Sequence, residues 1–258
     1  MLAASAPPAA APNVAVSGPI LFARYAYPPN RLGLCGPDDA PSLIGSAVEG
    51  AEREVRSLAR GFEGAYPYLA LIASENGIAD PLDRRVVEAY WLGNGLSRRV
   101  RQGALHRNVD ERFRRRLDRR AWRWLEAAVA AGSRPVHAFH VLEVYPRVGL
   151  MRGGDGGPIV AAMDACRIRW GRVIGIEADR LLVEARHLEL VDGRLALTPA
   201  RPEAVQAWRG AGGLLDGVEP GELVALHWGW ACDRLTPSQA RSLVAWTRAA
   251  LRVANAAI

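Results

Sequence analysis

The chain contains no lysine, and all 33 of its basic side chains are arginines. Contacts with carboxylates or phosphates therefore fall to arginine, whose flat guanidinium makes bidentate hydrogen bonds. Against 27 acidic residues the formal net charge is +6, which suits an acidic protein partner, nucleic acid or anionic lipid. A solvated arginine-rich surface explains the same balance without any partner and is the simpler interpretation.

Cysteine is scarce as well. Its three occurrences, Cys35, Cys166 and Cys232, are an odd number too small for a disulfide framework, so we expect a reducing, cytoplasmic location. Long hydrophobic runs are missing, and no uncharged segment reaches the length of a membrane-spanning helix. Residues 1–12 are rich in alanine and proline but lack the basic start and apolar core of a signal peptide. We expect a soluble protein in which residues 1–19 form a flexible tail.

Common catalytic motifs are also absent. The glycine-rich stretch over residues 153–157 is not followed by the Lys-Ser/Thr pair of a phosphate-binding Walker A loop. Neither a Gly-x-Gly-x-x-Gly turn between a strand and a helix nor a Gly-x-Ser-x-Gly nucleophile elbow occurs. The sequence therefore gives no positive sign of catalysis.

The first half of the chain has helical periodicity. Between Leu43 and Phe62, apolar residues recur at intervals of three and four, which predicts one helix. Further helices are predicted over residues 68–73 and from residue 80 to about 93. Asn108, followed three residues later by Glu111, resembles a capping box and predicts a helix that ends at Gly132. That helix would carry the strongest basic stripe of the chain, formed by Arg112, Arg115, Arg116, Arg119 and Arg123.

The second half changes to strand patterns. Residues 136–148 are rich in β-branched and aromatic side chains and predict a strand, after which the glycines of 153–157 predict a flexible link. More strands are predicted over residues 168–176, 181–190, 195–197 and 222–230, with a hairpin turn at Asp192-Gly193 and a short helix over 202–208. Thr236 and Pro237 predict the start of a C-terminal helix. The predicted class is α+β, with a mainly helical domain over residues 20–150 and a small β-barrel plus C-terminal helix over 160–258.

Two motifs in the second half carry a family resemblance. The later one places His227 at the end of an apolar strand, in the pattern Gly-Asp/Glu-x-Val-x-x-His-x-Gly-x-Ala, and consists of Gly221, Glu222, Val224, His227, Gly229 and Ala231. The earlier one begins with Cys166, which is predicted to open a strand, and continues with Ile168, Gly171, Arg172 and Val173. Through both motifs, residues 163–248 resemble the HypC/HupF family, small OB-like barrel chaperones for the assembly of NiFe hydrogenases. The whole chain also resembles an uncharacterised bacterial family.

The resemblance implies a carrier of iron rather than an enzyme. Family members hold an iron bearing cyanide and carbon monoxide, together with a HypD-like protein, and pass it to the precursor of the hydrogenase large subunit. Cys166 is then the thiolate ligand and His227 the second ligand, in a cytoplasmic maturation factor with no membrane or nucleic-acid partner. The family cysteine follows the initiator methionine, whereas Cys166 lies inside the chain.

Three further residues are weaker metal-ligand candidates. His137 and His140 are three residues apart, so in the predicted strand they would point to opposite faces and could not chelate one ion together. Cys35 lies in a glycine-containing loop before the first long helix, where a thiol can be reactive or face a metal.

Two other functions fit the same sequence. The arginines, with Trp122, Trp124, Trp170, Trp228 and Trp230, would suit a basic small barrel that binds nucleic acid. Alternatively, the chain is an enzyme or an accessory subunit in which the barrel is only structural. A tight site built from Cys35, His137 or His140 would favour that third interpretation.

Overall fold

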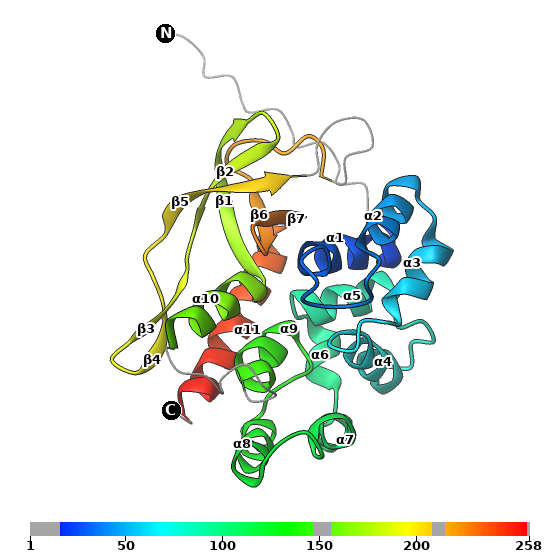
Figure 1. The fold of residues 1–258 in the computed structure, drawn as a ribbon, viewed down its shortest axis with the longest axis vertical. Coiled ribbons are helices and arrows are strands. Elements are labelled where there is room, and N and C mark those ends of the chain that lie inside the picture. Colours follow the sequence, from blue (N-terminus) through cyan, green and yellow to red (C-terminus); the bar gives the residue numbers. More distant parts are fainter. Residues whose placement is uncertain (1–15, 147–155, 208–214, 257–258) are drawn as a thin grey trace.

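The computed structural model describes residues 16–146, 156–207 and 215–256, with helices gathered on one side and a β-barrel on the other (Figure 1). Residues 1–15 and the first glycines of the 153–157 link lie outside these ranges. The flexible tail predicted over residues 1–19 is wrong at its end, because Gly18 and Pro19 are buried in the first helix. Among the described residues, no helix is both long and apolar enough to cross a membrane.

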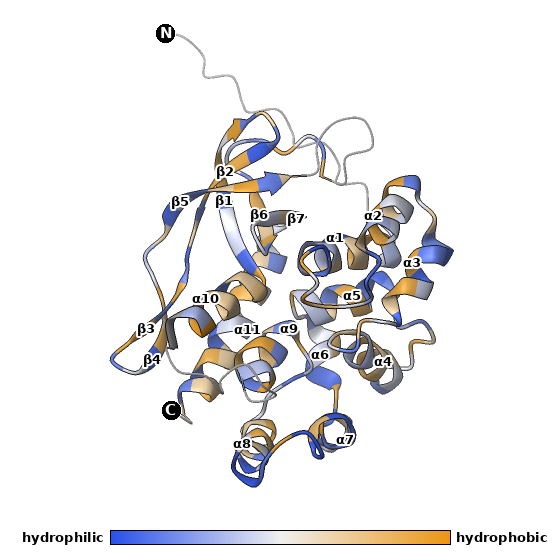
Figure 2. Cartoon of the chain, in the orientation of Figure 1, coloured by the Kyte–Doolittle hydropathy of each residue, from blue (hydrophilic) through white to orange (hydrophobic). Residues whose placement is uncertain are grey.

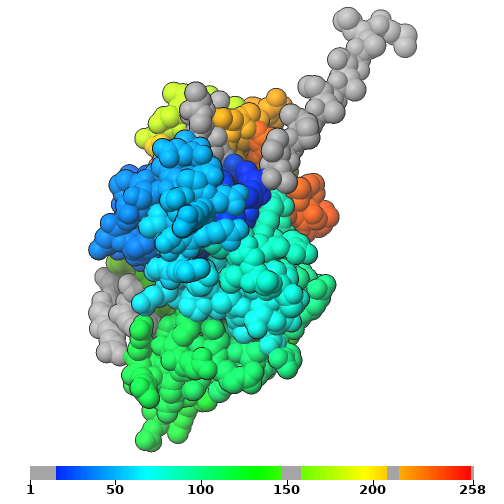
Figure 3. All heavy atoms as spheres, turned by 90° about the vertical axis from the view of Figure 1, so that its right-hand side faces the viewer, coloured from blue at the N-terminus to red at the C-terminus, as the bar shows by residue number. Residues whose placement is uncertain are grey.

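The N-terminal half is helical, as predicted. Its helices are α1 (Gly18–Asn30), α2 (Ala40–Glu49), α3 (Glu52–Ala59), α4 (Tyr66–Glu75), α5 (Arg84–Trp91), α6 (Gly95–Arg99), α7 (Gln102–Phe113), α8 (Arg119–Ala130) and α9 (His137–Phe139), and the π-helix η1 (His140–Val144) follows α9 directly. Figure 3 shows α7 and α8 as a lobe at one end of the molecule, below the helices that precede them.

The second half forms a small closed barrel. Helix α10 (Gly156–Cys166) leads into it, and its strands are β1 (Arg169–Glu177), β2 (Arg180–Ala185), β5 (Arg201–Ala207), β6 (Leu223–His227) and β7 (Trp230–Leu235), closed in the order β1-β2-β5-β7-β6. Strands β3 (Leu188–Val191) and β4 (Arg194–Leu197) form a separate hairpin around the predicted Asp192-Gly193 turn. The final helix α11 (Pro237–Asn255) begins with a capping box between Thr236 and Gln239. The α+β class, the helical first half and the barrel with its C-terminal helix are thus confirmed.

One hydrophobic core joins the two halves. A second, smaller cluster fills the barrel and includes Val173, Val183 and Leu226, but the main cluster contains side chains from both the helices and the barrel strands. Polar contacts reinforce this joint, since Arg24 of α1 pairs with Asp233 of β7 at 3.4 Å. The barrel is therefore packed directly against α1.

Two helix predictions in the first half are wrong in their boundaries. The helix predicted between Leu43 and Phe62 is divided into α2 and α3, because Gly50 adopts a left-handed conformation with φ of 72°. Asn108 lies inside α7 rather than at its start, and α8 begins separately with the Asp118 carboxylate accepting from the backbone N–H of Ala121. The predicted arginine stripe is consequently spread over α7, α8 and their connection, where Figure 2 shows hydrophilic residues gathered.

The strand and helix predictions around the site also need correction. Residues 137–144 are helical, although β-branched side chains are frequent there, because nearly all of them are buried against neighbouring helices. Cys166 ends a helix instead of opening a strand. Residues 201–207 form β5 rather than a helix. The strand predicted over 222–230 is interrupted by a turn at Trp228-Gly229, which separates β6 from β7.

Candidate metal centre

Cys166 lies at the C-terminal end of α10 and lines an internal cavity. The backbone N–H of Trp228 donates to the carbonyl of Ala165 at 2.8 Å, so the β6–β7 turn is fastened to the last turn of this helix. Both central residues of that turn have positive φ, 48° at Trp228 and 76° at Gly229, as a tight hairpin requires. This contact brings His227, the residue before the turn, to Cys166.

His227 points an unprotonated nitrogen into the molecule. Its Nδ1 lies 2.7 Å from the carbonyl oxygen of Tyr25, and because a carbonyl only accepts, Nδ1 carries the proton and donates it. Nε2 therefore holds a lone pair, and it has no hydrogen-bond partner among the described residues although the side chain is 1% exposed. A histidine fixed by a backbone carbonyl on one nitrogen and open on the other is how metal-binding imidazoles are oriented.

His137 approaches from the helical half. Its Nε2 lies 2.9 Å from the carbonyl oxygen of Cys166 and 3.9 Å from the Cys166 Sγ, while its Nδ1 lies 3.1 Å from the hydroxyl of Tyr90. That hydroxyl is also 3.1 Å from the carbonyl oxygen of Gly64. Tyr90 can therefore donate to Nδ1 while Nε2–H binds the Cys166 carbonyl. For Nε2 to bind a metal, the ring must turn away from the Cys166 carbonyl and its proton must move to Nδ1, where the Tyr90 hydroxyl can accept from Nδ1–H and donate to Gly64.

The ligand atoms of His137, Cys166 and His227 all lie within 4.8 Å of one another. Donors around a tetrahedral ion with bonds of 2.0–2.3 Å are about 3.5 Å apart, so modest side-chain rotations would complete a site. Burial lowers the pKa of His227 to about 4 and that of His137 well below its usual value, which keeps both imidazoles neutral. Burial raises the pKa of the Cys166 thiol to about 12, and only a bound cation would favour its thiolate.

These side chains face a cavity of about 350 Å³. Its walls include the aromatic residues Tyr90, Trp91, Tyr145 and Trp228, and Cys35 and His140 also line it. One thiol and two neutral imidazoles, without a carboxylate among them, suit a soft or borderline cation such as Fe²⁺, Co²⁺ or Zn²⁺ rather than Mg²⁺ or Ca²⁺. Three protein ligands beside a cavity would leave a coordination position open.

Comparison with known proteins gives a family. Residues 14–258 match the model of DUF6390, which is described as a family of unknown function. The chain belongs to the DUF6390 family. No curated protein and no solved structure matches it.

The candidate residues of this DUF6390 protein lie closer together than the sequence predicted. Cys166 and His227 are adjacent, as the resemblance implied, and their binding of metal stays a prediction. His137 joins them because its segment is helical, contrary to the expectation from a strand. His140 lines the same cavity with its Nδ1 3.5 Å from the Tyr68 hydroxyl. Tyr90 was not anticipated, and no local sequence signal marks it.

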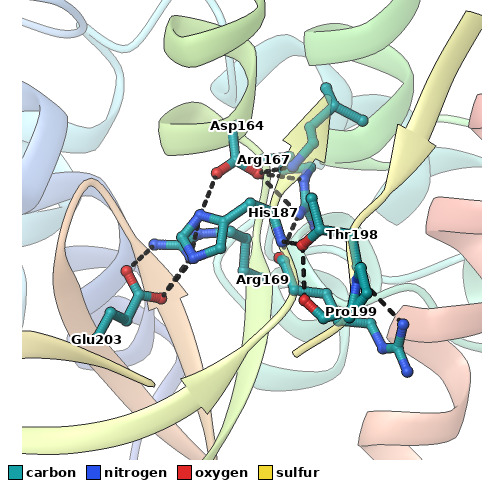
Figure 4. A network of polar contacts seen from close by, with 9 residues as sticks. Asp164, Arg167, Arg169, His187, Thr198, Pro199 and Glu203 are labelled. Atoms are coloured by element: carbon teal, nitrogen blue, oxygen red, sulfur yellow. Dashed lines mark hydrogen bonds and ion pairs between the residues drawn. The ribbon is translucent and has the colours of Figure 1, made fainter. Parts of the chain in front are cut away.

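A second buried polar cluster begins only two residues before Cys166 (Figure 4). Asp164 accepts from the Arg167 guanidinium at 2.8 and 3.0 Å and lies 2.9 Å from His187 Nδ1. Arg169 on β1 pairs with Glu203 on β5 at 2.5 and 3.2 Å. We call these five residues the ion-pair network; they connect α10 to the barrel and so fix the helix that carries the thiol.

Proposed function

We propose that this DUF6390 protein is an accessory factor of NiFe-hydrogenase maturation that holds an iron unit bearing cyanide and carbonyl and helps deliver it to the large-subunit precursor. The observation that carries the proposal is the approach of the Cys166 Sγ to a ring nitrogen of His227 within 4.8 Å. These are the two residues that the HypC/HupF resemblance implies as ligands, and they meet at the junction of a small closed barrel with a helical half.

The donor chemistry supports this cargo. A thiolate donates strongly to low-spin iron, and neutral imidazoles supply further ligands without adding charge. The cavity of about 350 Å³ is far larger than a single ion or water requires, so an iron that carries its own diatomic ligands has room. A site with three protein donors also leaves the metal incompletely enclosed, which suits a protein that must release it.

The surface beside the cavity suits a protein partner. Leu34 lines the cavity yet is 47% exposed, and Leu32 in the same loop is 48% exposed. Exposed apolar side chains at the entrance to a site favour docking of another protein. We assign this entrance to the HypD-like protein that would load the iron and to the hydrogenase precursor that would receive it, both in the cytoplasm.

Infrared spectroscopy tests the cargo directly. The full chain is purified anaerobically from cells that express the hydrogenase maturation machinery, beside Cys166→Ala, His227→Ala and, as a matched control, Cys232→Ala. We expect cyanide and carbonyl stretching bands in the parent and the control, and their loss with Cys166→Ala. Unchanged hydrogenase maturation with both ligand variants would overturn the proposed role.

One observation favours a second candidate, an enzyme that uses the same metal. His137 makes the group a three-ligand site, and three ligands with an open position are the arrangement of catalytic zinc centres. An enzyme would retain its metal against a chelator and an acceptor protein, whereas a carrier would lose it to the acceptor. No observation favours nucleic-acid binding, because Trp122 is buried and Trp124, Trp170 and Trp230 pack against the core.

A further inference from the structure

The loop between α1 and α2 holds a second cysteine at the cavity. The side-chain amide of Asn30 donates to the carbonyl oxygens of Cys35 at 2.8 Å and of Pro37 at 2.6 Å, and Asn30 itself is 5% exposed. Gly36 has a φ of 84°, and a Cβ there would lie 2.4 Å from the ring of Phe62. Only glycine fits this position, so the loop is fixed in the conformation that places Cys35 in the cavity wall.

Cys35 faces the same space as the metal group. Cys35, Cys166 and Tyr90 all line this cavity. The Cys35 Sγ and the His140 Nε2 both lie beside Gly64, at 4.0 Å and 3.4 Å from the position that a Cβ of this residue would take, so they border the same part of the cavity wall. Cys35 is thus a cavity thiol, unlike Cys232, which is buried near the carbonyl oxygen of Trp230 and is not a lining residue of this cavity.

The metal group has room for a fourth metal ligand. His227 Nε2 is buried and without a hydrogen-bond partner in the part of the chain described, and a ring nitrogen of His227 lies within 4.8 Å of the ligand atoms of Cys166 and His137. His137, Cys166 and His227 supply three ligands, and four is the number that a tetrahedral ion takes. Cys35 stands outside the group of atoms within 4.8 Å, so a fourth bond requires its side chain to turn inward from the wall.

We propose that Cys35 supplies a second thiolate to the metal bound by His137, Cys166 and His227, so that the occupied site takes one thiolate from each half of the chain. The inference rests on the proposed function only in requiring that a metal is bound at this group, whatever its source. On binding, two S–H protons leave to the buffer and two sulfur–metal bonds form, with no change of oxidation state. The resulting donor set of two thiolates and two imidazoles fills the tetrahedral shell of a bare Zn²⁺ or Co²⁺, whereas a six-coordinate iron would still have two positions for diatomic ligands of its own.

Cobalt(II) titration of the reduced full chain counts the thiolates. Each cysteine–cobalt bond adds to the near-ultraviolet sulfur-to-metal charge-transfer band, which neither imidazole nor carboxylate produces. We expect the saturated band of Cys35→Ser to fall to about half of the parent intensity, that of Cys166→Ser to fall by at least as much, and Cys232→Ser to match the parent. Circular dichroism of each variant checks that it is folded.

The outcomes separate this inference from the proposed function. A band in Cys35→Ser equal to that of the parent would overturn the second thiolate and leave the three-ligand site intact. Absence of any charge-transfer band in the parent would overturn metal binding at Cys166 and with it the carrier role.

A second measurement needs no substitution. The parent chain is alkylated with iodoacetamide at increasing Zn²⁺ concentrations, and modification of each cysteine is followed by peptide mass spectrometry. Protection of Cys35 and Cys166 with the same midpoint supports two thiolates on one ion. Full alkylation of Cys35 at Zn²⁺ concentrations that protect Cys166 would overturn the inference.

Discussion

The two buried polar clusters around the end of α10 solve the same physical problem in opposite ways. The ion-pair network buries two acids and two arginines, and each charge finds a partner within hydrogen-bond distance. The metal group, starting two residues later at Cys166, contains no carboxylate and no guanidinium. Its polar atoms are neutral. Each cluster holds a buried imidazole nitrogen without a hydrogen-bond partner among the described residues, His187 Nε2 in the network and His227 Nε2 in the metal group, but only the metal group sets it beside a thiol and a second imidazole.

This difference separates a structural cluster from a binding site. Buried charges are tolerated when they are paired, and a paired cluster gains nothing from a ligand. A buried nitrogen lone pair without a hydrogen-bond partner costs stability until a proton donor or a cation binds it. The network therefore holds α10 in place, and the metal group is the candidate for binding a cation.

The largest effect should come from breaking the network. Replacing Asp164 by alanine leaves the guanidinium of Arg167, itself 1% exposed, buried without its carboxylate. We expect a loss of about 3–5 kcal/mol in the free energy of unfolding, measured with urea. Cys166→Ala should cost far less, because it removes a neutral atom at a cavity wall. Equal losses for the two variants would contradict the assignment of the network as the structural cluster.

Next in size is stabilisation by metal. Zn²⁺ present at about one hundred times its dissociation constant should raise the free energy of unfolding by about 2.7 kcal/mol, because only the folded chain assembles the three ligands. The gain should disappear in His227→Ala and persist in His187→Gln, which changes the network instead. A gain that survives His227→Ala would place the metal elsewhere.

Tyr90→Phe tests whether the Tyr90 hydroxyl fixes the orientation and the tautomer of the His137 imidazole. Phenylalanine keeps the packing but loses the hydroxyl that can accept from Nδ1–H and donate to the carbonyl of Gly64. We expect metal affinity to fall about 10–100-fold, the usual effect of removing a partner of a ligating histidine. Isothermal titration with Zn²⁺ measures it, and an unchanged affinity would mean that Tyr90 only packs.

Counted per pH unit, the smallest effect is a pH dependence of the metal-free protein. His227 has a folded-state pKa of about 4, against an unfolded value near 6.5, so the unfolded chain binds the proton first. Stability should therefore be full above pH 6.5 and decline as the pH falls towards 4, by about 1.4 kcal/mol per pH unit from this residue. His227→Gln should reduce that slope, whereas Cys166→Ser should retain it. Urea titrations between pH 4.5 and 7 distinguish the two.

Local sequence signals predicted some of these features and missed others for identifiable reasons. The Thr236 cap, the Asp192-Gly193 turn and the apolar strand that ends at His227 depend only on neighbouring residues, so the sequence predicts them. His137 was misjudged because its β-branched neighbours favour a strand, and tertiary burial overrides that preference. The role of Tyr90 depends on a residue 47 positions away, a separation at which no periodicity or spacing rule applies.

The hydrogen bond between His227 Nδ1 and the carbonyl of Tyr25 spans 202 positions of the chain. During synthesis, α1 leaves the ribosome long before the strand that carries His227. Until that strand docks, Cys166 has at most one of its two imidazole neighbours, and the pocket has no barrel wall. The three-ligand group cannot form on a nascent chain that lacks His227, so any metal that it binds arrives after this strand has been made.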